Sequence, residues 1–75
     1  MTPIDVVFRY GASPGEKEMR ALGNVREVYG IRRISFDEKE HTVRVEYDAT
    51  RLSDEVVASL LRSASLDVRE KVALV

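Results

Sequence analysis

Apolar residues occupy every even position from Ile4 to Tyr10, close to the start of the chain. The residues between them include the charged Asp5 and Arg9. Successive side chains of a strand point to opposite faces of its sheet. This alternation therefore predicts a strand over residues 3–10 with one buried face.

A helix start follows at Ser13, in the sequence Ser-Pro-Gly-Glu. The serine can cap a helix, the proline suits the first helical position, and the glutamate completes a capping box. Apolar residues then recur at helical spacing, at Met19, Leu22, Val25 and Val28 or Tyr29. We expect one helix to about Val28 with Gly30 as its C-terminal stop, although Gly23 within it costs about 1 kcal/mol relative to alanine.

Two further alternating segments are joined by a short polar turn. Residues 31–37 would place Ile34 and Phe36 on a buried face, and residues 42–47 alternate between polar and apolar side chains. The turn between them, residues 37–41, is entirely polar. Two such strands separated by a short polar turn predict a β-hairpin.

The last third of the chain predicts a second helix and a fourth strand. Ser53 can cap a helix over residues 54–64, with acidic residues in its first turn, where negative charge is favourable. The buried stripe of this helix would consist of Val57, Leu60, Leu61 and Ala64. Residues 66–74 follow as a strand in which the even-numbered positions are apolar, except for Glu70. The apolar residues of that parity are Leu66, Val68, Val72 and Leu74.

The predicted order of elements is βαββαβ. Two helices in this order can cover one face of a four-stranded antiparallel sheet, and right-handed crossovers place the first and third strands in its centre. We therefore predict an α+β protein with a ferredoxin-like sandwich, the sheet order 4-1-3-2 and one domain over residues 1–75. The predicted core consists of Ile4, Val6, Phe8, Leu22, Val25, Ile34, Phe36, Val43, Val45, Val57, Leu60, Leu61 and Val68.

Composition narrows the classes of function. The 75 residues include 12 basic and 13 acidic side chains, a formal charge of −1, which does not favour a general nucleic-acid or anionic-membrane binder. The chain has no cysteine, which excludes disulfides and thiolate metal sites. No apolar run approaches the roughly 20 residues that cross a bilayer. We expect a cytoplasmic protein, or an excised cytoplasmic domain, with no membrane partner.

With these elements in place, the chain resembles the heavy-metal-associated (HMA) domain of copper chaperones and metal-pumping ATPases. Residues 30–37, Gly-Ile-Arg-Arg-Ile-Ser-Phe-Asp, are similar to the Gly-Val-x-x-Val-x-Val-Asp second strand of that family. Residues 42–48 resemble its third strand and residues 52–64 its second helix. The resemblance covers about residues 4–68 and implies the same fold.

The sequence departs from that family in the first loop. Metal-binding members carry Met-x-Cys-x-x-Cys there, and counting back from Gly30 the two cysteines would fall near Pro14 and Lys17. Neither side chain ligates a soft metal as a thiolate does. The resemblance therefore implies a degenerate metal site, and we expect no cofactor.

Two weaker ligand sites can be read from the loops. Gly11, Ser13 and Gly15 would let backbone amides approach an anion at a helix N-terminus, beside Lys17, although the capping box favours ordinary capping of the helix. A divalent cation could be held by three residues of the hairpin turn, for which a solvated turn is the favoured interpretation. Those three residues are Asp37, Glu40 and His41.

The outward face of the sheet is the third candidate. Its charged residues would be Arg9, Arg33, Arg44, Glu46, Arg69 and Lys71. RNA-recognition domains share the βαββαβ order but need aromatic residues on this face, so nucleic acid is not favoured as a partner. The two edge strands could each pair with another chain.

These observations favour a non-catalytic interaction or regulatory module, an HMA-like domain without cysteine ligands. No serine–histidine–acid arrangement suggests an enzyme. The expected partner is another protein or domain, or a second copy bound through an edge strand. An ACT-like domain that binds a small ligand is the alternative, and residual heavy-metal binding or transport is a weaker one.

Overall fold

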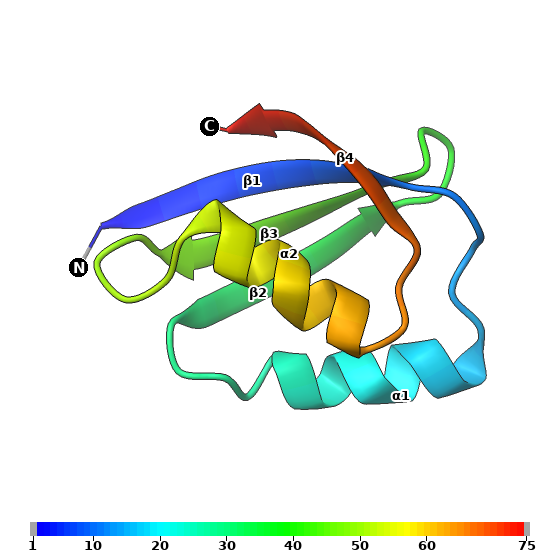
Figure 1. The fold of residues 1–75 in the computed structure, drawn as a ribbon, viewed down its shortest axis with the longest axis horizontal. Helices are drawn as coiled ribbons and strands as arrows, with labels where there is room; N and C mark the ends of the chain where they lie inside the picture. The colour runs from blue at the N-terminus through cyan, green and yellow to red at the C-terminus, as the bar shows by residue number, and fades with distance from the viewer. Residues whose placement is uncertain (1, 75) are drawn as a thin grey trace.

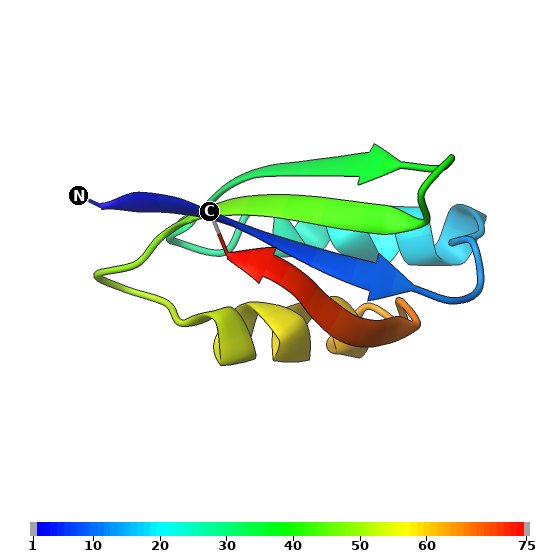
Figure 2. The ribbon, with the colours of Figure 1, turned by 90° about the horizontal axis from the view of Figure 1, so that it is seen from above.

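The computed structural model describes residues 2–74 as a βαββαβ fold (Figure 1). Its elements are β1 (Pro3–Tyr10), α1 (Glu16–Val25), β2 (Ile31–Asp37), β3 (Thr42–Asp48), α2 (Asp54–Ser63) and β4 (Val68–Leu74). The strands form one antiparallel sheet in the order β2-β3-β1-β4, which confirms the predicted topology. Figures 1 and 2 show both helices on the same side of this twisted sheet. Neither described helix has the length and apolar content to cross a membrane.

The core lies between the sheet and the two helices. Val6 pairs with Val45 and Phe8 with Val43 across the central strands, and all four are buried. The prediction is confirmed for most core positions. The predicted residues that are only partly buried are Ile4, Phe36 and Leu60. The buried residues missing from the predicted core are Tyr10, Ile31, Tyr47, Ala58, Ala64 and Leu66.

Helix α1 is shorter at both ends than the sequence pattern predicts. Its N-cap is Gly15, whose N–H donates to Glu18 Oε1 at 2.9 Å, so the expected cap at Ser13 is wrong. The helix ends at Val25, and the chain then turns through Gly30, which has a φ of +106°. That left-handed conformation suits glycine and lets the chain enter β2, where Gly30 O accepts the Asp48 N–H at 2.7 Å.

The end of α1 decides which apolar residues are buried. Because the chain leaves the helical path after Val25, Tyr29 does not continue the buried stripe and is 71% exposed. Met19 is also largely exposed, at 43%. Leu22 and Val25, the two residues of this helix in the predicted core, are both buried, and Val28 packs partly against the core.

Helix α2 matches its prediction closely. Ser53 Oγ accepts the Val56 N–H at 3.2 Å, which confirms Ser53 as the cap. The helix ends at Ser63, one residue earlier than predicted, and buries Val57 and Leu61.

Strand β4 begins at Val68, two residues later than predicted. The prediction that its even-numbered residues all face the core is wrong. Its register against β1 shifts twice, between Val7 and Phe8 and between Arg9 and Tyr10. Each shift is a local bulge that turns the strand and disrupts the alternation of its side chains. Val72, expected on the buried face, is consequently 47% exposed.

Candidate interaction surface

The first loop is occupied by hydrogen bonds within the protein. The Gly11 N–H donates to Asp67 O at 2.9 Å, and the Ala12 N–H donates to Asp67 Oδ2 at 3.1 Å. The Ala12 N–H and then Arg69 lower the pKa of the Asp67 carboxyl. A Cβ at Gly11 would collide with the Asp67 and Arg69 side chains, so glycine is needed there for close packing.

The predicted anion residues therefore have other partners or lie apart. The amides of Gly11 and Gly15 are both bonded to acidic residues of the chain, Asp67 and Glu18. Ser13 and Lys17 are exposed. The structure does not bring these groups together around one point.

The hairpin tip lies against the first loop. His41 Nδ1 is 3.1 Å from Gly11 O, and its ring stacks on Tyr10 with centroids 5.2 Å apart. Asp37 Oδ1 accepts the Glu40 N–H at 3.2 Å, which closes the turn. Within residues 2–74 no group of three His, Asp or Glu side chains converges as a metal site would.

The outward face of the central strands carries ion pairs. Arg44 contacts Asp5 through Nε at 2.7 Å and Nη2 at 2.6 Å. Arg9 Nη1 lies 3.8 Å from Glu70 Oε1 at the β4 side of the sheet. These arginines are therefore balanced by carboxylates of neighbouring strands, in the cross-strand manner that stabilises sheets.

Arg33 is the exception on this face. It lies on β2 opposite Glu46 in register, beside a hollow of about 110 Å³ that Ser35 and the Arg44–Asp5 pair also line. Its neighbour Arg32 contacts Glu46 at 3.7 Å, whereas Arg33 makes no ion pair with any described residue. The exposed guanidinium of Arg33 is thus available to a partner.

Two residues predicted for this face lie elsewhere because of the β4 bulges. Lys71 pairs in register with buried Phe8, and its Nζ reaches Asp54 Oδ2 at 2.8 Å at the start of α2. This contact lowers the pKa of Asp54 and raises that of Lys71. Arg69 bonds Asp67 at 3.0 Å. The outward set that remains is Arg9, Arg33, Arg44 and Glu46.

Strand β2 forms an open edge of the sheet. Figure 2 shows it along the upper margin of the molecule, with α1 behind the sheet. Ile34 O accepts from Arg26 Nη2 at 3.4 Å, so the Ile34 carbonyl points away from β3. In an antiparallel ladder both backbone groups of a residue point to the same side and alternate along the strand, so Phe36 also directs its N–H and C=O outward.

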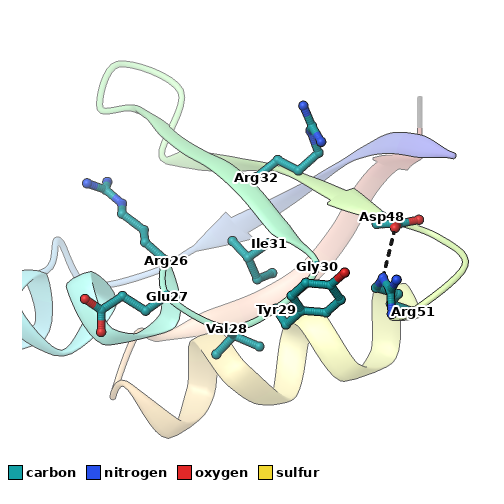
Figure 3. A pocket seen from close by; sticks show the side chains of 9 residues that line it. All are labelled: Arg26, Glu27, Val28, Tyr29, Gly30, Ile31, Arg32, Asp48 and Arg51. Atoms are coloured by element: carbon teal, nitrogen blue, oxygen red, sulfur yellow. Dashed lines mark ion pairs between the residues drawn. The ribbon is translucent and has the colours of Figure 1, made fainter. Parts of the chain in front are cut away.

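A further cluster, which the sequence analysis missed, lies where α1 leads into β2 (Figure 3). Asp48 is buried and its carboxylate accepts from the Thr50 hydroxyl at 2.7 Å, which together with the Thr50 N–H lowers its pKa to about 2. Arg51 lies 3.4 Å from Asp48 and its Cζ is 4.1 Å from the centre of the Tyr29 ring. These contacts tie the β3–α2 loop to the loop between α1 and β2, and the Asp-x-Thr spacing is the only sequence signal for them.

Comparison with known proteins gives no further assignment. No family model, curated protein or solved structure matches this chain.

Proposed function

We propose that this chain is a non-catalytic protein-interaction domain that binds an extended segment along the open edge of β2. The observation that carries the proposal is the outward backbone of Ile34 and Phe36 beside Arg33, which makes no ion pair within residues 2–74. An extended segment can add a strand to such an edge, with main-chain hydrogen bonds giving affinity and side chains giving specificity. Arg33 favours a carboxylate on the incoming strand.

Strand β4, the other edge of the sheet, is less suitable for binding an extended segment. Strand β4 carries two register shifts against β1, and bulges of this kind are a recognised way of protecting an edge from pairing. Strand β2 has one shift against β3, between Ile31 and Arg33, and its register is regular from Arg33 to Asp37. The HMA resemblance supports an interaction domain that has kept the family layout and lost its thiolate ligands. The polar groups of the first loop support a structural role for that loop, because they bond to Asp67 and Glu18.

The test uses the ¹⁵N-labelled chain and two synthetic peptides of alternating valine and threonine. One peptide carries aspartate at its centre and the other carries lysine at the same position. We expect the aspartate peptide to shift the amide resonances of Ile34 and Phe36, and to bind less tightly to Arg33→Gln. Shifts confined to β4, or no binding of either peptide to the monomeric chain, would overturn the proposal.

A further inference from the structure

From the charge pattern of β2 we infer that the edge pairs with β2 of a second copy, as an antiparallel dimer centred on Ser35. This inference rests on the proposed function, because it uses the same edge, and it adds the identity of the partner. The strand is basic at its start, with Arg32 and Arg33, and acidic at its end, with Asp37. Antiparallel pairing of two copies brings the basic half of each against the acidic end of the other.

The pairing register follows from which backbone groups point outward. Ile34 and Phe36 direct their N–H and C=O to the edge, so these two residues would exchange hydrogen bonds between the copies. If Ile34 of one copy lies opposite Phe36 of the other, Ser35 lies opposite its own counterpart on the twofold axis. With the twofold axis between the two Ser35 residues, which form a non-hydrogen-bonded pair, the Ile34–Phe36 pair on each side of the axis exchanges backbone hydrogen bonds.

The same register aligns the charges. Arg33 of one copy then lies opposite Asp37 of the other, twice by symmetry, on the outward face. Directly opposite residues have Cβ atoms about 4.5–5.5 Å apart, well within reach of a guanidinium. Asp37 uses Oδ1 to accept the Glu40 N–H, and its Oδ2 has no partner among residues 2–74. Moving the register by one residue either way separates Arg33 from Asp37.

The remaining features of the edge are compatible with this pairing. The contact of Arg26 with Ile34 O is 3.4 Å long and exposed to solvent on the arginine side, so an incoming Phe36 N–H can replace it. On the face of the sheet that carries the helices, the second copy would cover the partly buried side chain of Phe36. The formal charge of −1 leaves little overall repulsion between two copies.

Charge exchange provides the first test. Sedimentation of the whole chain should show a dimer, and Arg33→Asp or Asp37→Arg should each raise its dissociation constant at least about tenfold, because each variant faces like charges across the axis. Mixing the two variants should restore association as a heterodimer, since each then meets the opposite charge. Circular dichroism checks that both variants remain folded.

Cysteine cross-linking provides a second, independent test. The chain has no native cysteine, so Ser35→Cys introduces a single thiol whose Cα would lie about 4.5 Å from its counterpart, within disulfide range. We expect rapid oxidation to a covalent dimer. The matched control is Ser59→Cys on the exposed side of α2, which should oxidise slowly.

Each outcome bears on the inference. A monomeric chain, no heterodimer on mixing, or equal oxidation of the two cysteine variants would overturn the second-copy assignment. If the chain is monomeric but the aspartate peptide still shifts Ile34 and Phe36, the proposed function stands and only the partner is wrong. If neither the peptide nor a second copy engages β2, both proposals fail.

Discussion

The Asp48 carboxylate accepts two hydrogen bonds from Thr50, one from the hydroxyl at 2.7 Å and one from the backbone N–H at 3.0 Å. It also accepts the Thr2 N–H at 3.3 Å and lies 3.4 Å from Arg51 Nε. One acidic side chain thus fixes the start of the chain and the β3–α2 loop together. These donors favour the ionised form, which explains why its pKa is lowered to about 2.

Asp48 should make the fold sensitive to acid. A carboxyl whose folded pKa is depressed from 3.8 to about 2 stabilises the protein above its unfolded pKa, and this contribution is lost as the pH falls through that interval. We expect Asp48→Asn to lower the melting temperature by several degrees at pH 6 and to flatten the fall in stability between pH 4 and pH 2. Thermal unfolding followed by circular dichroism measures both. Thr50→Ser, which keeps the hydroxyl, is the control, and an unchanged acid slope in Asp48→Asn would contradict this role.

The two glycines around the end of α1 should respond in opposite directions to alanine. Gly23 lies inside the helix and a Cβ there meets nothing within 4 Å, so Gly23→Ala should add about 1 kcal/mol of stability, or roughly 4–8 °C in melting temperature. Gly30 has a φ of +106°, and a Cβ would lie 3.0 Å from Leu52 Cδ1. Gly30→Ala should therefore cost more than about 1 kcal/mol. Urea unfolding gives both values, and a destabilised Gly23→Ala would show that glycine is required in α1.

Regular alternation made much of the fold predictable. The bounds of β1 follow from apolar residues at every second position, and the start of α2 follows from the Ser53 cap. Helix α1 was predicted too long because Val28 and Tyr29 fall at helical spacing by coincidence. Only the packing of the chain shows that the helix has already ended at Val25.

The candidate surface was only partly predictable for a related reason. Arg33 and Arg44 lie in the regular part of the β2–β3 pairing, after the register shift between Ile31 and Arg33, and face outward as the sequence predicts. Lys71 does not, because a bulge shifts the parity of β4, and no residue type near it signals an extra residue. Which backbone groups of β2 point outward depends on its pairing with β3, a long-range relationship that no local pattern contains.

Core burial predicts a contrast between two apolar helix residues. Leu61 is fully buried between α2 and the sheet, so Leu61→Ala should cost about 2–5 kcal/mol through lost transfer energy and a residual cavity. Met19 lies at the helical spacing of the apolar residues of α1, outside the predicted core, and is 43% exposed. Met19→Ala should change the free energy of unfolding by no more than about 0.5 kcal/mol. Urea unfolding of both variants tests this, and a large cost at Met19 would mean that α1 packs more deeply than described.

Arg26 should protect the β2 edge from pairing. Its guanidinium places a charged donor 3.4 Å from Ile34 O, on the backbone group that an incoming strand would use. Charged side chains at sheet edges oppose strand addition. Removing this contact with Arg26→Ala should lower the dissociation constant of the dimer roughly two- to threefold, the factor that corresponds to about 0.5 kcal/mol for an exposed contact.

The control for Arg26 must change the charge without touching the edge. Arg62 lies in the last turn of α2 and is exposed, so Arg62→Ala removes the same charge away from β2. Sedimentation of both variants at equal salt separates the local effect from the change in net charge. If Arg62→Ala tightens the dimer as much as Arg26→Ala, general electrostatics explains the result and the guarding contact has no role. If Arg26→Ala raises the dissociation constant of the dimer instead, the guanidinium contributes a contact to the second copy in the dimer, and it does not guard the edge.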